Sequence, residues 1–95
     1  MDINFDPGKN ETNIRTRGLS FERAADFEFD TAVIEIDGRK AYGEDRYTAI
    51  GFLDGRLHVL VFTLRADSLR VISFRKANAR EIKRYEQTAQ SRNDR

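Results

Sequence analysis

Several charged side chains have the types and spacing that could bind an anion and transfer a proton. Glu44 and Arg46 lie two residues apart, so in an extended segment their side chains share one face. Arg65 at a strand end and Arg75 before a helix each carry a planar guanidinium, which matches two phosphate oxygens. Glu44 could accept a proton or orient an arginine, and Lys9 could protonate a leaving group. The alternative for each is an ordinary ion pair or a solvated surface residue.

The charge of the chain is divided unevenly along its length. The whole chain has 17 basic and 16 acidic residues, a formal net charge of +1. Residues 65–95 hold nine basic and four acidic side chains, which gives +5, and residues 1–64 hold eight and twelve, which gives −4. This split suggests a polyanionic partner for the C-terminal third, where Arg70, Lys76 and Arg80 lie. Charge alone, however, is more typical of a solvated helix face.

Other side chains that could take part in catalysis or binding have structural explanations. Histidine titrates near neutral pH, but His58 lies within an apolar strand, so a packed, hydrogen-bonded histidine is expected. Tyr42 could stack on a base or pack on its loop. Phe74 and Tyr85 are expected in the core. Asn13, a polar residue of the first helix, is expected to face water.

The composition argues against a metal site. The chain has no cysteine and one histidine, which leaves few nitrogen or sulfur ligands. Asp26, Glu28 and Asp30 alternate with Phe27 and Phe29, as on the exposed side of a helix end. We therefore expect neither a metal nor a cofactor. The sequence lacks a basic-then-apolar leader and a long apolar run, so a cytoplasmic location is expected.

The elements that must position these residues follow from local patterns. Alternation of apolar and polar residues, bounded by turn signals such as Asp37-Gly38 and Asp54-Gly55, predicts strands. The strands are expected over Ile3–Phe5, Val33–Ile36, Tyr47–Leu53, Leu57–Leu64 and residues 69–74, with a polar connection over Arg39–Asp45. Leu60, Val61 and Phe62 are consecutive apolar residues, typical of a central strand covered on both faces.

Three helices are expected. Asp6-Pro7 and Gly18 predict the start and the end of the first helix, and Ser20 caps a second. Asn78 and Glu81 form a capping box for a third, whose stripe contains Ile82, Tyr85 and Ala89. The pattern predicts one α+β domain over residues 1–95. It would contain an antiparallel meander of about four strands, two N-terminal helices and one C-terminal helix packed on one face, and a frayed tail over about 88–95.

A set of short motifs runs through nearly the whole chain. They are Phe5-Asp6-Pro7 with Lys9 and Asn13; Gly18-Leu19-Ser20-Phe21; Asp30-Thr31-Ala32; Arg39 with Tyr42-Gly43-Glu44-x-Arg46; Gly51-x-x-Asp54-Gly55-Arg56-x-His58-Val59; Phe62-Thr63-x-Arg65; and Arg70-x-Ile72-Ser73-x-Arg75-Lys76-Ala77. With these motifs the chain resembles the BrnT family of type II toxins. One departure is Thr16-Arg17-Gly18, where many members have Lys-His-Gly, so a histidine role cannot be carried over there.

The resemblance implies a RelE-like endoribonuclease that cleaves RNA, with messenger RNA as the expected substrate, and inhibits translation. It also implies neutralisation by a BrnA-like antitoxin with a ribbon-helix-helix DNA-binding domain, a heterotetramer with that antitoxin, and contact with operator DNA through it. The catalytic candidates are Arg65, Arg75, Glu44, Arg46 and Lys9. The RNA-binding candidates are Arg17, Tyr42, Arg70, Lys76 and Arg80. Because the last strand leads directly into the last helix, we expect Arg65, Arg75, Lys76 and Arg80 to face one cleft.

Two other functions remain open from the sequence. The altered Thr16-Arg17 suggests a RelE-like module that has lost cleavage and acts with its antitoxin as an operon corepressor. The chain could also be a DNA- or RNA-binding domain outside any toxin pair. A neighbouring reading frame for a ribbon-helix-helix protein would favour the enzyme or the corepressor over this third function.

Overall fold

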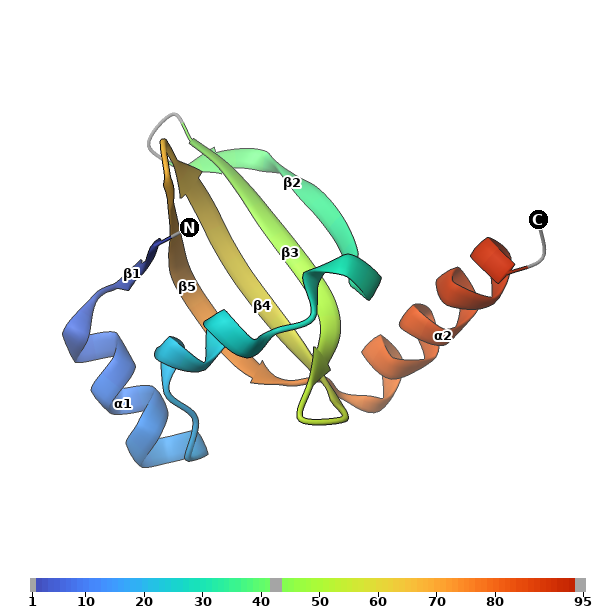
Figure 1. Ribbon diagram of the computed structural model, residues 1–95, viewed down its shortest axis with the longest axis horizontal. Coiled ribbons are helices and arrows are strands. Elements are labelled where there is room, and N and C mark those ends of the chain that lie inside the picture. Colours follow the sequence, from blue (N-terminus) through green and yellow to red (C-terminus); the bar gives the residue numbers. More distant parts are fainter. Residues whose placement is uncertain (1, 42–43, 94–95) are drawn as a thin grey trace.

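A mixed five-stranded sheet forms the centre of the protein (Figure 1). The computed structural model describes residues 2–41 and 44–93. In chain order the elements are β1 (Asp2–Phe5), α1 (Pro7–Arg17), the 3₁₀ helices η1 (Phe21–Asp26) and η2 (Phe29–Thr31), β2 (Val33–Ala41), β3 (Glu44–Leu53), β4 (Arg56–Arg65), β5 (Ser68–Lys76) and α2 (Ala79–Asn93). The predicted α+β class is confirmed.

The first strand belongs to the sheet. The expected meander of about four antiparallel strands did not include it. The strand order is β1-β5-β4-β3-β2, and β1 pairs with β5 in parallel while the other neighbours are antiparallel. Strand β4 is central, as predicted from its apolar run. The parallel pairing joins Asp2 to Ser68, so it depends on residues 66 positions apart in the sequence. No local pattern in the sequence could specify that partner.

The hairpin of β2 and β3 is longer than its turn signals predicted. Strand β2 continues to Ala41, and β3 begins at Glu44, so the turn expected at Asp37-Gly38 is wrong. The connection expected over 39–45 is strand at 39–41 and 44–45, and its residues 42 and 43 lie outside the described residues. Asp37 pairs with Arg46, and the register is irregular between Asp37 and Ala41. A bulge of this kind lets strand pairing continue past a glycine.

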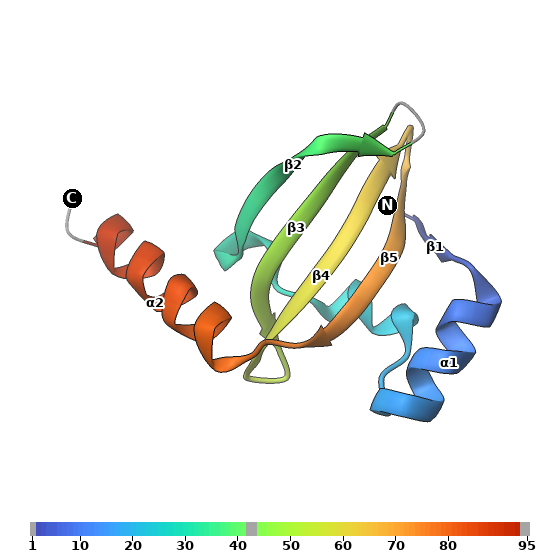
Figure 2. The ribbon, with the colours of Figure 1, turned by 180° about the vertical axis from the view of Figure 1, so that it is seen from behind.

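The two faces of the sheet carry separate apolar clusters. On one face η1 and η2 cover Leu60, Phe62 and Phe74; on the other, α2 packs against Val59 with Tyr85. In Figure 2 the strands lie in front of η1 and η2. The expectation that all helices pack on one face is therefore wrong. Successive strand residues point to opposite faces, so an apolar run in β4 requires cover on both.

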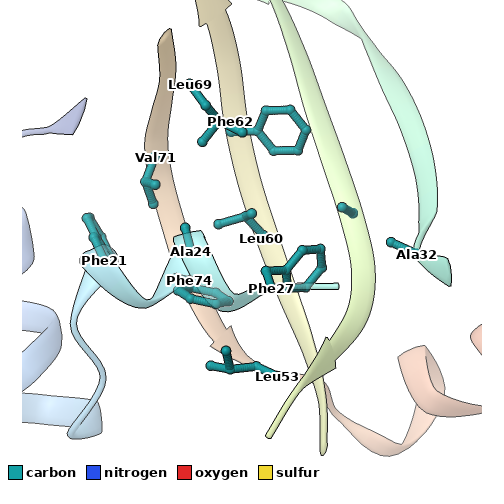
Figure 3. Packing of buried hydrophobic residues seen from close by; sticks show 11 residues of the cluster. Phe21, Ala24, Phe27, Ala32, Leu53, Leu60, Phe62, Leu69, Val71 and Phe74 are labelled. Atoms are coloured by element: carbon teal, nitrogen blue, oxygen red, sulfur yellow. The ribbon is translucent and has the colours of Figure 1, made fainter. Parts of the chain in front are cut away.

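The second N-terminal helix is a 3₁₀ helix. The Ser20 hydroxyl accepts a hydrogen bond from the amide of Glu22, as a cap. Phe21, Ala24 and Phe27 recur every third residue, the period at which side chains of a 3₁₀ helix align, and all three are buried. Figure 3 shows them in the cluster with Leu60 and Phe74.

Helix α1 is fixed to β5 by one buried amide. The Asn13 side chain donates to the carbonyl oxygens of Leu19 and Phe74, both at 2.9 Å. Asn13 is 9% exposed, so the expectation that it faces water is wrong. The ends of α1 agree with prediction, because Asp6 caps its start and Gly18 ends it with φ 65°. Asn13 therefore sets where α1 lies beside β5.

Helix α2 starts with the predicted capping box. The Asn78 side chain accepts from the amide of Glu81, and the Glu81 carboxylate accepts from the amide of Asn78, both at 2.9 Å. Tyr85 is buried and donates to the carbonyl oxygen of Thr31 at 3.0 Å, which ties α2 to η2. The helix continues through Asn93, past residue 88, where a frayed tail was expected. The final two residues of that tail lie outside the described residues.

Candidate active site

A row of polar side chains crosses the sheet at the end where β4 finishes. Asn4 of β1 pairs with Arg70 of β5, and Arg70 pairs with Thr63 of β4. Arg46 of β3 lies beside Thr63, because the next pair along is Tyr47 with Phe62. Paired residues project from the same face of a sheet. This face is the one that α2 covers at the other end of β4, so the row lies beyond the helix.

A cavity of about 260 Å³ lies over this row. We call it the arginine cavity; its lining residues are Lys9, Glu44, Arg46, Thr63, Arg65, Arg70 and Ile72. They carry four positive charges and one negative charge, a local excess of +3. Four of the five predicted catalytic residues meet here, together with the predicted RNA-binding Arg70. A concentration of cations in a partly enclosed space is an electrostatic site for an anion.

Two residues that line the arginine cavity each have a donor without a protein acceptor. Arg46 Nε and Thr63 Oγ1 are buried and have no hydrogen-bond partner within residues 2–41 and 44–93. A buried polar group left unpaired costs about 1–3 kcal/mol. An oxygen acceptor, such as that of a phosphate, a carboxylate or a water molecule, could pair with these donors once the side chains turn toward the cavity.

Glu44 is held within the same site by Arg65. Arg65 Nε lies 2.7 Å from Glu44 Oε1, and Arg65 Nη2 lies 3.2 Å from Oε2. This two-pronged pair fixes the carboxylate against the cavity. Arg70 donates to the side-chain oxygen of Asn4 at 3.3 Å, which leaves its charge uncompensated. The cavity thus contains one oriented carboxylate, and the positive charge of its lining residues exceeds the negative charge of that carboxylate.

Arg75 lies in a different place from Arg65. It lines a second cavity of about 320 Å³, the Arg17 cavity, whose lining is Arg17, Gly18, Leu19, His58, Arg75 and Lys76. Arg80 is exposed and lines neither cavity. The expectation that Arg65, Arg75, Lys76 and Arg80 face one cleft is therefore not met. Five residues of strand separate Arg70 from Arg75, which is about 16 Å.

The Arg75 guanidinium forms a fork with Glu81. Both nitrogen–oxygen distances are 2.8 Å. Hydrogen bonds from Arg75 hold the pKa of Glu81 below its ordinary value, and the same pair raises the pKa of Arg75. Arg84 similarly pairs with Glu35 of β2, so part of the basic side of α2 stabilises the fold.

His58 is a packed residue, as predicted. It is 5% exposed, its ring lies against Phe74, and its Nδ1 donates to the carbonyl oxygen of Arg56 at 2.8 Å. Because a carbonyl oxygen can only accept, Nδ1 carries a proton. Tyr42, the remaining RNA-binding candidate, lies outside the described residues.

Sequence reasoning missed Thr63 as a site residue, although it lies in a quoted motif. Thr63 and Arg65 alternate along β4, and this spacing places both on the face that carries the cavity. The pattern could have identified Thr63 once β4 and its buried face were known. Asn13 was missed for a different reason, because its acceptors come from residues 19 and 74.

The acidic residues of η1 and η2 form no metal site. Asp26 pairs with Arg23 at 3.1 Å, and Arg23 also holds Asp54 at 2.8 Å. Over the part of the chain that the structure describes, no group of three or more His, Cys, Asp or Glu residues could hold a metal ion. Among the same residues, no helix is long and apolar enough to cross a membrane.

A comparison with protein families gives a match over most of the chain. A family model described as "Ribonuclease toxin, BrnT, of type II toxin-antitoxin system" matches residues 5–81. The matched range contains every residue that lines the arginine cavity and the Arg17 cavity. No curated protein matches the chain.

Proposed function

Because the chain belongs to the BrnT family, the ribonuclease toxins of type II toxin-antitoxin systems, we propose that it is an endoribonuclease whose active site is the arginine cavity. The family match agrees with the resemblance seen in the motifs. The observation that carries the proposal for the site is the pair of unsatisfied donors, Arg46 Nε and Thr63 Oγ1, within a cavity of net positive charge. These donors fit the oxygens of a phosphodiester.

The cleavage step assigns a role to each group. The Glu44 carboxylate takes the proton of the ribose 2′-hydroxyl as the 2′-oxygen attacks phosphorus. Arg46 and Thr63 hold the non-bridging oxygens, and Arg65 and Arg70 stabilise the charge of the phosphorane. The bond from phosphorus to the 5′-oxygen then breaks. The products are a 2′,3′-cyclic phosphate and a 5′-hydroxyl.

The proton of the new 5′-hydroxyl is assigned to Lys9. Lys9 lines the arginine cavity from α1, whereas Glu44 lines it from β3. An acid on the side opposite the base suits in-line displacement, in which the attacking and leaving oxygens lie on either side of phosphorus. Lys9 makes no hydrogen bond or ion pair through its side chain within the described residues, so it remains available to the leaving group.

The proposed reaction uses no metal and no cofactor. In many nucleases, metal ions neutralise the charge that develops on the phosphate. Here Lys9, Arg46, Arg65 and Arg70 supply that positive charge, and Glu44 supplies the base. The chemistry therefore balances with protein groups alone.

The proposed biological partner is a protein antitoxin. Membership of a type II system implies such a partner. We assign it as a BrnA-like protein with a ribbon-helix-helix domain, which forms a heterotetramer with the toxin and connects it to operator DNA. It would neutralise the toxin by placing acidic residues against the basic cavities. The substrate would then be cytoplasmic messenger RNA, and its cleavage would stop translation.

The corepressor without cleavage is the second candidate. The reason to consider it is that Thr16-Arg17 departs from the family pattern. Thr16 donates to the carbonyl oxygen of Thr12 on α1, and Arg17 lines the Arg17 cavity. Neither residue lines the arginine cavity. The departure thus leaves the proposed catalytic groups in place, which favours the enzyme.

The experiment is expression of the chain with and without the antitoxin of its own operon. We expect growth arrest and loss of intact cellular RNA when the chain is expressed alone, and rescue by the antitoxin. Soluble expression with normal growth and intact RNA would contradict the enzyme. It would favour the corepressor if the pair still binds operator DNA.

A further inference from the structure

Three cavities follow one another along α1 and β5, and each has lining residues from both elements. The arginine cavity is the first and the Arg17 cavity the last. Between them lies a central cavity of about 410 Å³, lined by Gly8, Lys9, Thr12, Asn13, Thr16, Arg17, Phe21, Ile72 and Ser73. Lys9 and Ile72 line both the first and the central cavity, and Arg17 lines both the central and the last. The cavities therefore adjoin one another, and we call the series of three the groove.

The two walls of this groove run in the same direction. Figure 1 shows α1 beside the edge of the sheet formed by β1 and β5. Lys9, Asn13 and Arg17 are four residues apart, so they occupy one side of α1. Lys9 and Arg17 are separated by about 12 Å of helix. Asn13, between them, is bound to the Phe74 carbonyl oxygen and fixes the helix against the strand.

Positive charge is concentrated at both ends of the groove. The arginine cavity has its excess of cations at one end, and Arg17, Arg75 and Lys76 lie at the other. Arg17 and Lys76 are exposed, and neither forms an ion pair within the described residues. The middle presents the hydroxyl-bearing residues Thr12, Thr16 and Ser73. An occupant with anionic groups at two separated points would fit this distribution.

We infer that the groove is the track of single-stranded RNA, and that the Arg17 cavity is a second phosphate subsite separate from the cleavage site. This inference rests on the proposed function. A span of about 12–16 Å corresponds to roughly four stacked nucleotides at about 3.4 Å each. A basic groove that follows the backbone is a recurring way to bind single strands. An RNA therefore needs more than about four nucleotides to contact both ends at once.

The subsite assigns Arg17 a role that depends on RNA length. A short oligonucleotide can fill the arginine cavity without reaching Arg17, whereas a longer one engages both. The Arg17→Ala variant should therefore weaken only the longer ligand. Arg15 is the matched control, because it is an exposed arginine on the same helix turn that lines none of the three cavities.

The test measures the affinity of labelled 2′-O-methyl RNA of three and of ten nucleotides, which cannot be cleaved. For Arg17→Ala we expect about a tenfold loss with the ten-nucleotide ligand and no loss with the shorter one. For Arg17→Ala with the longer ligand, the slope of log K against log salt concentration should decrease in magnitude by about 0.7. This value corresponds to one lost phosphate contact. Arg15→Ala should bind both ligands as the wild type does. Thermal unfolding confirms that both variants fold.

The inference is overturned if Arg17→Ala and Arg15→Ala behave alike, if the loss is equal for both lengths, or if no oligonucleotide binds at low salt. These results are separable from the proposed function. Length-dependent binding without cleavage of unmodified RNA would contradict the enzyme and support the track. Cleavage without any effect of Arg17 would support the enzyme and overturn the track.

Discussion

Arg75 and Glu81 form a two-pronged ion pair that joins the end of β5 to the first turn of α2. Glu81 also closes the capping box with Asn78, so one carboxylate serves both the helix start and the strand end. The pair holds the Arg75 guanidinium away from the Glu44–Arg65 pair. We therefore assign Arg75 to the second phosphate subsite, and expect its loss to weaken RNA binding more than the rate of the chemical step.

The first prediction concerns acid stability. Because the ion pair lowers the folded-state pKa of Glu81, it stabilises the fold above the unfolded pKa of about 4.3. That contribution is lost as the pH falls through the lowered folded-state pKa. The Glu81→Gln variant should therefore lose about 1 kcal/mol at pH 7, and the difference from wild type should shrink below about pH 4. Urea unfolding at several pH values measures both effects.

Glu86→Gln is the control for this experiment. Glu86 is an exposed residue of α2, and its side chain has no hydrogen bond or ion pair within the described residues. Its replacement should change the free energy of unfolding by a few tenths of a kcal/mol at most. A Glu81→Gln difference that stays constant from pH 7 to pH 3 would contradict the assignment.

The second prediction concerns the anchor of α1. Asn13→Ala removes both hydrogen bonds of the side chain and leaves the carbonyl oxygens of Leu19 and Phe74 without this donor. We expect a loss of about 1–3 kcal/mol in the free energy of unfolding. The exposed Glu11, on the same helix, provides the control as Glu11→Ala. If the two variants are equally stable, Asn13 is not the anchor.

Helix starts, tight turns and the central strand could be predicted because their causes are local. Asp54-Gly55 forms the expected hairpin turn, with φ of 52° and 78°. The capping box at Asn78 and the buried Tyr85 were also predicted correctly. In each case neighbours within a few residues supply the reason.

Long-range pairing explains what the sequence could not predict. Ile3 and Phe5 alternate as a strand should, but the parallel partner of β1 lies more than sixty residues away. The grouping of Lys9 with Arg46 and Arg70 depends on where Asn13 fixes α1. Likewise, Arg65 and Arg75 each end a strand segment near a turn, and only the register of β4 and β5 shows that they lie far apart.

The third prediction concerns metal ions. If Lys9, Arg46, Arg65 and Arg70 supply the positive charge, cleavage of a purified unstructured RNA should proceed at an unchanged rate in EDTA. An unstructured substrate removes the effect of magnesium on RNA folding. Loss of cleavage in EDTA with recovery on added magnesium would show that the protein groups alone are insufficient.

The most direct test of the account is single-turnover cleavage by Arg46→Met. This change removes the unpaired buried donor and its charge while it keeps an unbranched apolar stem. We expect the cleavage rate to fall on the order of a hundredfold, because a group that stabilises the transition state is lost. The free energy of unfolding should not fall, because Arg46 Nε has no hydrogen bond to lose within the described residues.

Arg56→Ala provides the reference in that measurement, since Arg56 is an exposed arginine of β4 that lines none of the three cavities. The account predicts wild-type cleavage by Arg56→Ala and about one hundredth of that rate by a folded Arg46→Met. Equal rates for the two variants would contradict the claim that RNA is cleaved in the arginine cavity.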